Sequence, residues 1–144
     1  MGHRVTDPDV FAAAVAFARQ IGMVPMELHK EQPGYVINSL LVPFLESAVA
    51  LAANGVADPH MIDRTWMIAT GAPRGPFAIL DIIGMRTSYQ LTLAKAEAGD
   101  AAARTAAAWL KRDFIDRNRL GVESGEGFYT YPDPRYRDAD FLRA

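Results

Sequence analysis

The chain has 144 residues, of which 50% are hydrophobic and 22% are charged, and this balance excludes a mainly disordered protein. Its formal net charge of −2 and its pI of about 5.9 favour neither nucleic acid nor an anionic membrane as a partner. The absence of cysteine excludes disulfides, thiolate metal sites and a thiol nucleophile.

The first predicted element is a helix that begins after Asp7, with Pro8 at its first position. Gly22 is expected to end it. The following run, residues 23–28, has the length and apolar character of a strand, and Pro25 restricts it to a sheet edge or a strand start. A single strand has nothing to pair with, so this run either lies against helices or is the remnant of a missing domain.

The longest apolar pattern predicts a helix between the turn at residues 32–34 and Gly55. Little of its circumference is polar, so we expect it to be buried on most sides. Asn38 and Ser39 are polar positions near its start. Pro43 supplies no N–H to the carbonyl of Ser39 and is expected to kink the helix there. The main apolar stripe consists of Ile37, Leu41, Phe44, Ala48 and Leu51.

Capping residues and glycine stops predict further helices in the second half of the chain. A breaker-rich loop at residues 71–76 interrupts them, and a glycine-rich turn after Gly121 leads into an aromatic, extended segment that ends at Pro132. The pattern therefore predicts a mainly α protein. The expected helices cover residues 58–71, 76–84, 85–98 and 100–118.

Neither a membrane span nor a signal peptide is predicted. No unbroken apolar run reaches the roughly 20 residues that a spanning helix needs, and residues 1–7 lack the apolar core of a signal peptide. We therefore expect a cytoplasmic protein without a membrane partner.

The histidines are the usual candidates for acid–base chemistry. None of them has a second histidine or a carboxylate at metal-binding spacing in an apolar setting, so no metal site is predicted. His60 and Asp63 share a helix face that we expect to be exposed to solvent. Surface or capping roles are the preferred interpretation for His3, His29 and His60.

Two other residues could carry chemistry. Asp81 lies between apolar residues, and we expect it to accept hydrogen bonds from the amides of a neighbouring loop rather than to transfer protons. Arg74 could bind a phosphate, although a single loop arginine is usually solvated. No Gly-x-Gly-x-x-Gly loop follows a strand and no Walker loop is present, so no nucleotide or cofactor site is predicted in this chain.

Asn38 is the strongest local candidate for a functional residue. Its carboxamide can both donate and accept hydrogen bonds, which suits the binding of a carbonyl and a hydroxyl group. It could equally satisfy the backbone groups that Pro43 leaves unpaired. The residues alone slightly favour the second interpretation.

Several motifs, in order and at the right spacing over about residues 32–131, resemble the C-terminal domain of the 3-hydroxyacyl-CoA dehydrogenase family. The resemblance implies a helical bundle like the C-terminal domain of 6-phosphogluconate dehydrogenase over residues 32–144. Residues 1–31 resemble the last α/β unit of that family's NAD-binding Rossmann domain. The motifs are Gln32–Pro43, Gly55–Pro59 with Ile62-Asp63, Gly75–Phe77 with Leu80-Asp81 and Gly84, and Arg119–Gly121 with Ser124–Tyr129.

The resemblance implies an enzyme that oxidises the 3-hydroxyl of an acyl-CoA to a ketone and passes the hydride to NAD. Asn38 matches the asparagine that orients the substrate near the catalytic histidine, and it is predicted to be catalytic. Asn38 and Ser39 are predicted to bind substrate, although the family commonly has arginine where Ser39 stands. The resemblance also implies a homodimer.

No residue here matches the family's catalytic histidine and glutamate, so this chain is expected to be a C-terminal part that is inactive alone. NAD would belong to the full-length parent and not to this chain. Two alternatives remain open. One is a stand-alone helical binding or scaffold subunit that pairs with a separate Rossmann subunit, and the other is a related hydroxy-acid dehydrogenase that acts on a sugar acid.

Overall fold

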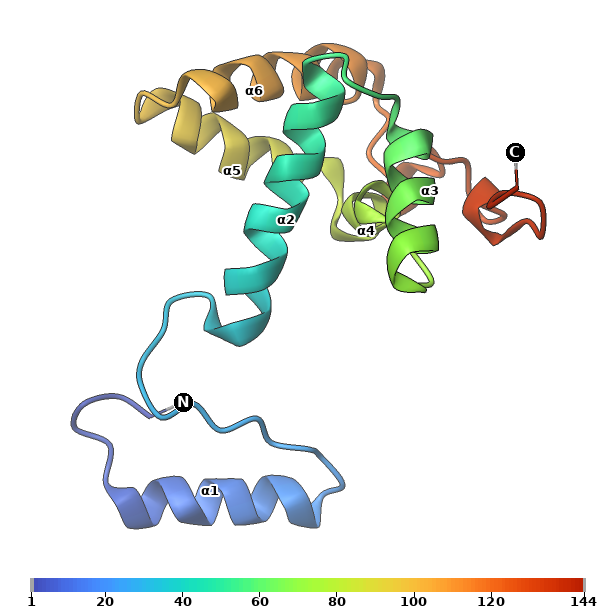
Figure 1. Cartoon of the computed structure of the whole chain (residues 1–144). Helices are drawn as coiled ribbons and strands as arrows, with labels where there is room; N and C mark the ends of the chain where they lie inside the picture. Colours follow the sequence, from blue (N-terminus) through green and yellow to red (C-terminus); the bar gives the residue numbers. More distant parts are fainter. Residues whose placement is uncertain (1, 144) are drawn as a thin grey trace. The chain divides into compact units, whose positions relative to one another are not determined.

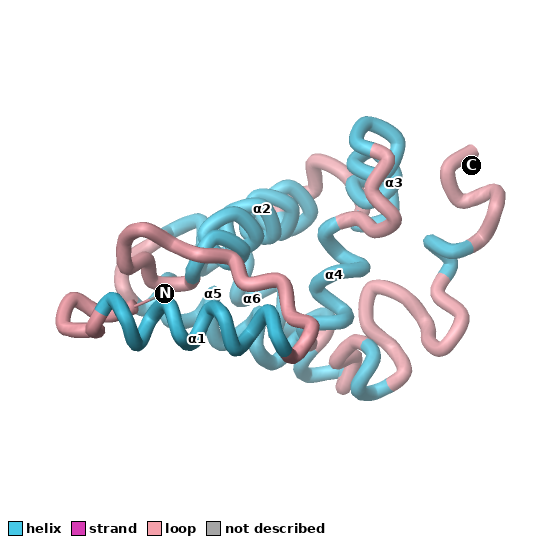
Figure 2. The backbone as a smooth tube through the Cα atoms, turned by 90° about the horizontal axis from the view of Figure 1, so that it is seen from below, coloured by secondary structure: helices cyan, strands magenta, loops and turns pink. Residues whose placement is uncertain are grey.

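The computed structural model describes residues 2–143, which form helices and loops with no strand among them (Figures 1 and 2). The predicted mainly α class is confirmed. The chain divides into two compact units, Met1–Val42 and Pro43–Ala144, which are described separately below. The α-helices are α1 (Pro8–Gln20), α2 (Tyr35–Ala53), α3 (Pro59–Thr70), α4 (Pro76–Ile83), α5 (Met85–Glu97) and α6 (Ala101–Asp113), and the short 3-10 helices are η1 (Ile115–Arg117), η2 (Val122–Ser124) and η3 (Arg135–Arg137).

Helix α1 begins as its capping residues predict. The Asp7 carboxylate accepts hydrogen bonds from the backbone N–H groups of Asp9, at 2.7 Å, and Val10, and Pro8 occupies the first turn. No residue of α1 is buried. The first unit therefore has no apolar core of its own around this helix.

Residues 23–28 do not form the strand that their apolar character predicts. Pro25 has no N–H to donate, and residues 2–143 contain no strand with which this run could pair. The prediction of a strand is therefore wrong for this chain. The assignment of residues 1–31 to the remnant of another domain stays a prediction.

Helix α2 runs through Pro43 without a break and links the two units. Its buried residues are Leu45, Ala48 and Val49, all in its second half. In the first half, Ile37 is 64% exposed and Leu40 is 68% exposed. The prediction that this helix is buried on most sides is therefore wrong, because the described residues cover one stripe of its second half only.

Helix α2 also corrects the prediction that no segment is long enough to span a membrane. It has 19 residues and a mean hydropathy of 1.8, which suffice by length and composition. A single helix of this kind is weak evidence for a membrane span, since core helices of soluble proteins have the same properties.

The second unit contains the apolar core. Helices α5 and α6 form an antiparallel hairpin (Figure 1), α3 packs on α4, and α4 packs on α5. Aromatic rings fill the space between them: the Phe128 ring centroid lies 4.5 Å from that of Phe77 and 4.3 Å from that of Phe114. Phe77 and Phe141 are fully buried. This core holds the segment that follows α6 against α3 and α4.

Helix α6 ends at Asp113, earlier than the predicted boundary near Asn118. Phe114 leaves the helical conformation, and Asn118 adopts a left-handed conformation with φ 56°. The aromatic segment after Gly121 is also less extended than predicted. It forms η2 and two isolated bridges, both made by Glu126, in place of a strand.

Candidate functional site

Asp63 on α3 is fully buried and caps the start of α4. Its carboxylate accepts hydrogen bonds from the backbone N–H groups of Phe77, at 2.8 Å, and Ala78, at 3.0 Å. The N-cap residue of α4 is Gly75, which has no side chain to cap the helix. A carboxylate distant in sequence therefore satisfies the free amides at this helix start and lies at the positive end of its dipole.

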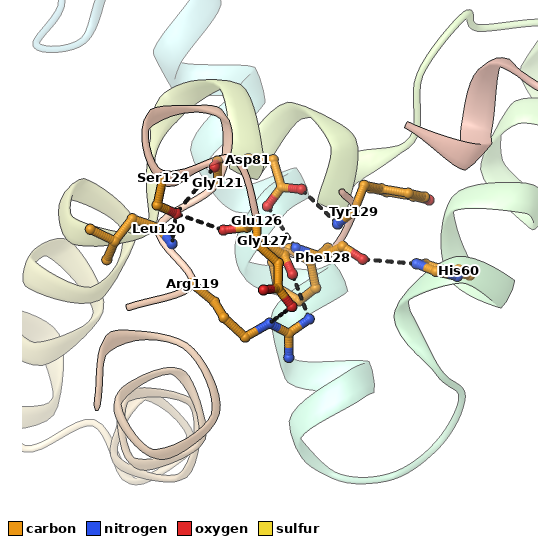
Figure 3. A network of polar contacts seen from close by, with 10 residues as sticks. All are labelled: His60, Asp81, Arg119, Leu120, Gly121, Ser124, Glu126, Gly127, Phe128 and Tyr129. Carbon is orange, nitrogen blue, oxygen red and sulfur yellow. Dashed lines mark hydrogen bonds and ion pairs between the residues drawn. The ribbon is translucent and has the colours of Figure 1, made fainter. Parts of the chain in front are cut away.

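Asp81, near the other end of α4, holds the loop that follows η2. It accepts hydrogen bonds from the backbone N–H groups of Phe128 and Tyr129, both at 2.9 Å (Figure 3). The Tyr131 hydroxyl also donates to it, at 3.0 Å. The exposure of Asp81 is 1%. The prediction that Asp81 binds the amides of a neighbouring loop is confirmed.

Tyr129 joins the two buried aspartates. Its backbone N–H donates to Asp81, and its hydroxyl donates to the Asp63 carboxylate at 2.9 Å. Burial, together with the charge of Asp63, raises the pKa of the Tyr129 hydroxyl above its ordinary value, so this group stays protonated as a donor. The two aspartates and this tyrosine form one connected network between α3, α4 and the loop.

His60 is part of the same region and is half-buried there. Its ring stacks on Tyr129 with centroids 4.5 Å apart, and its Nε2 lies 2.9 Å from the carbonyl oxygen of Phe128 (Figure 3). The face that His60 shares with Asp63 is therefore packed against the loop, which contradicts the prediction of a solvent-exposed face. Such a contact fixes the ring and leaves one ring nitrogen for other partners.

Arg119 supports the loop from its other side. Its guanidinium donates to the carbonyl oxygen of Gly127 at 2.6 Å, and its Nε lies 3.1 Å from a carboxylate oxygen of Glu126 (Figure 3). Ser124 accepts from the Leu120 N–H at 2.8 Å. These contacts close the glycine-rich turn on itself, so it serves as a rigid connection and not as a phosphate-binding loop.

The network is structural in character. The hydrogen-bond partners of both aspartates are donors of the protein itself, and both carboxylates are buried. Burial raises the pKa of Asp63 from 3.8 to about 6, against the lowering effect of its hydrogen bonds, and burial likewise raises the pKa of Asp81. His3 and His29 are exposed, and residues 2–143 contain no cluster of ligands that could hold a metal ion.

The sequence alone does not predict that Asp63 caps the start of α4. Its hydrogen-bond partners lie 14 or more residues away, so no local spacing identifies them. A signal was nevertheless present, because α4 starts at Gly75-Pro76 without a local capping side chain. A helix start of that kind, in an apolar setting, requires a cap from elsewhere in the fold.

Asn38 and Ser39 lie near the start of α2, in the first unit, and both are exposed. The Ser39 hydroxyl donates back to the carbonyl of Tyr35. The Asn38 carboxamide forms no hydrogen bond with any other residue of the described range 2–143. It therefore does not satisfy the backbone groups freed by Pro43, and the residue is exposed.

An unusual turn sets the position of Asn38. Gly34 has φ 79° and Tyr35, the first residue of α2, has φ 52°, so two successive residues are left-handed where the helix begins. A Cβ atom on Gly34 would lie 3.2 Å from the Cβ of Asn38. Left-handed backbone at a residue other than glycine costs energy and is common near functional sites. The assignment of Asn38 and Ser39 to a substrate site stays a prediction.

Comparison with known proteins identifies the family of this chain. The family model for the C-terminal domain of 3-hydroxyacyl-CoA dehydrogenase matches residues 34–131. Human mitochondrial hydroxyacyl-coenzyme A dehydrogenase is 31% identical over 88% of this chain and 40% of its own length. The 3-hydroxybutyryl-CoA dehydrogenase of Clostridioides difficile is 30% identical over 89% of this chain and 45% of its own length.

Two solved structures of oxidoreductases are also similar to this chain. A diketoreductase, which catalyses reactions of dicarbonyl compounds, is 51% identical with a TM-score of 0.83, over 91% of this chain and 45% of its own. The (S)-3-hydroxybutyryl-CoA dehydrogenase of Ralstonia eutropha is 31% identical with a TM-score of 0.70, over 89% of this chain and 44% of its own.

The matched proteins are oxidoreductases, and the family model that matches describes their C-terminal domain. The chain belongs to the 3-hydroxyacyl-CoA dehydrogenase family. It spans about two fifths of the length of the curated relatives it matches.

Proposed function

We propose that this chain is the substrate-cleft and dimerisation domain of an NAD-dependent 3-hydroxyacyl-CoA dehydrogenase and that it is inactive alone. The single observation that carries the proposal is the exposed, unpartnered carboxamide of Asn38 inside the matched segment. The proposal places the protein in the cytoplasm, without a nucleic-acid or membrane partner, in keeping with its net charge of −2.

In this proposal Asn38 orients the substrate. Its N–H₂ group donates to the 3-oxygen of the substrate, which carries negative charge during hydride transfer, and its own carbonyl can accept from a substrate hydroxyl. A donor held in place before the reaction favours the charge that develops on a substrate oxygen. The left-handed turn at Gly34 and Tyr35 limits where this side chain can lie, and Ser39 would line the same cleft.

NAD is the hydride acceptor in such a reaction. Residues 2–143 offer no strand followed by a glycine-rich loop and a helix, so they do not fit a dinucleotide. We therefore assign no step of the reaction in this chain to the cofactor. The proton acceptor for the hydroxyl would likewise lie outside the residues described here.

A second candidate function is favoured by one observation, the 51% identity to a diketoreductase, compared with about 31% to the acyl-CoA enzymes. A 3-oxoacyl-CoA is itself a dicarbonyl, with a ketone and a thioester carbonyl. Both candidates thus need the same hydrogen bonds from Asn38. They differ in whether the substrate carries CoA or is a free dicarbonyl compound.

A chimera would test the proposal and separate the two candidates. Residues 32–144 are fused to the N-terminal part of the Ralstonia eutropha enzyme in place of its matched segment. We expect NADH oxidation with acetoacetyl-CoA, and none by the 144-residue chain alone. Turnover of a free dicarbonyl compound in preference to acetoacetyl-CoA would replace the first candidate by the second.

In the chimera, Asn38→Ala should lower kcat on the order of 100-fold, the typical cost of removing one donor from a developing oxyanion. The matched control is Asn54→Ala at the other end of α2, where the side chain only donates to the carbonyl of Ala50. An Asn38 variant that keeps full activity would remove the assignment of this residue to the substrate site.

We propose that the exposed apolar surface of α2 forms a homodimer interface. Ile37, Leu40 and Leu51 are between 43% and 68% exposed, more than a stable surface helix normally leaves in water. Light scattering should give twice the monomer mass of 15.8 kDa at micromolar concentration. Leu40→Glu should yield the monomer, and a monomeric wild type would contradict the proposal.

A further inference from the structure

A hollow of about 520 Å³ opens on the surface of the second unit. It lies where the loop before α4, the end of α4, η2 and η3 come together. Its volume falls in the range of sites that hold small organic molecules, about 300–1,000 Å³. The residues that shape it are Arg74, Ile82, Val122, Tyr131, Tyr136 and Arg137.

The charge of this hollow has one sign. Arg74 and Arg137 line it, and no acidic residue does. Neither guanidinium forms an ion pair with a carboxylate of the described residues. By contrast, Arg112, Arg117 and Arg119 in the same unit are each paired with an acid. Among the described residues, the two guanidiniums of this hollow are thus not paired with a carboxylate, although that of Arg137 lies over the Tyr136 ring.

The remaining walls are largely aromatic or apolar. Ile82 is 53% exposed and Val122 is 48% exposed, so both present apolar surface to the opening. The ring of Tyr131 is fixed because its hydroxyl donates to Asp81 at 3.0 Å, and Tyr136 is buried with Arg137 beside its ring. The Tyr131 ring can therefore hold a flat group without a large loss of side-chain entropy, whereas the Tyr136 ring is already covered by the Arg137 guanidinium.

We propose that this hollow binds a small organic anion. Its phosphate or carboxylate pairs with Arg74 and Arg137, and its flat or apolar portion lies against Ile82, Val122 and the ring of Tyr131. Guanidinium groups bind both kinds of anion through charge-assisted hydrogen bonds. Arg74 taken alone is expected to be solvated, but a second guanidinium at the same opening makes a two-point anion site. The inference does not depend on the proposed function.

Calorimetric titration of the 144-residue chain tests the two parts of this site separately. The probes are phenyl phosphate, inorganic phosphate, benzoate and phenol. We expect phenyl phosphate to bind more tightly than inorganic phosphate and phenol to show no saturable binding. Comparing the affinity for benzoate with the affinity for phenyl phosphate distinguishes a carboxylate site from a phosphate site. Binding should weaken with added salt, because both arginines are exposed.

Matched variants locate the binding. Arg74→Gln and Arg137→Gln should each weaken the affinity for phenyl phosphate roughly tenfold, as expected for the loss of one charged hydrogen-bond donor. Arg135→Gln is the control, since it removes the same charge from an exposed neighbour that does not line the hollow. Equal weakening by all three variants, or no saturable binding of phenyl phosphate at millimolar concentration, would overturn the proposal.

Discussion

Replacing Gly127 by alanine should cost at least about 4 kcal/mol of folding free energy, at the extreme of the range for single substitutions. A Cβ atom at this position would lie 2.0 Å from Oδ1 of Asp81 and 2.7 Å from the Cα of Gly121. Asp81 cannot move aside without breaking its bonds to the Phe128 and Tyr129 amides. The methyl group therefore displaces the whole loop from α4.

Urea unfolding followed by tryptophan fluorescence measures this loss. Gly125→Ala is the control in the same loop, because a Cβ there meets no atom within 4 Å and only its φ of 78° opposes alanine. We expect it to cost about 1–2 kcal/mol. Tyr131→Phe, which removes one hydrogen bond to Asp81, should cost about 1–2 kcal/mol. If Gly127→Ala costs no more than Gly125→Ala, the close approach of the loop to Asp81 is refuted.

The sequence predicts the helix starts well because capping is local. Asp7, Asp58 and Asp100 accept from amides two or three residues further on, so spacing alone identifies them. Asp63 and Asp81 instead accept hydrogen bonds from amides that are distant in the sequence, 14 and 47 residues away. A pattern can show that such a carboxylate needs donors, but it does not show which ones.

Burial is predicted less well from the sequence, because it depends on which other segments pack on the apolar face of a helix. The apolar pattern of α2 correctly gives a long helix, yet Ile37 and Leu40 stay exposed because residues 2–143 do not cover them. Residues 23–28 similarly have strand-like composition without a strand to pair with. Asn38 is a candidate from its residue type and place in the helix, and this stays a prediction; its lack of hydrogen-bond partners among the described residues is visible only in the structure.

The stability of the second unit should fall as the pH rises from about 4 to about 6. The pKa of Asp63 is raised from 3.8 to about 6 by burial, so the folded state binds this proton more tightly than the unfolded state does. Its stabilising contribution is complete below the unfolded pKa and is lost as the pH passes the folded pKa. A shift of about two units corresponds to about 3 kcal/mol.

Other carboxylates also contribute to the pH dependence of the stability. Burial raises the pKa of Asp81 as well, so Asp81 acts in the same direction as Asp63. The pKa of Asp113 is lowered by its hydrogen bond with Arg112, which acts in the opposite direction, but this pair lies at the surface and contributes little. The net expectation is a urea midpoint that decreases across this pH range and levels off above it.

Asp63→Asn should remove about 3 kcal/mol of this pH dependence, the part that comes from Asp63. The variant will itself be less stable, because its amide group faces the N–H donors of Phe77 and Ala78. The readout is therefore the slope of stability against pH and not its absolute value. Asp116→Asn, at an exposed carboxylate paired with Lys111, is the control for the loss of a carboxylate at the surface.

A direct titration keeps this prediction testable even where Asp63→Asn fails to fold. The carboxyl carbon of Asp63 in the wild-type chain, followed by NMR, should titrate near pH 6. Asp63 contacts the Tyr129 hydroxyl, so the Tyr129 side-chain resonances should shift with the same midpoint. A midpoint at or below 3.8 would mean that the three donors outweigh burial, and stability would then increase with pH through the acid range.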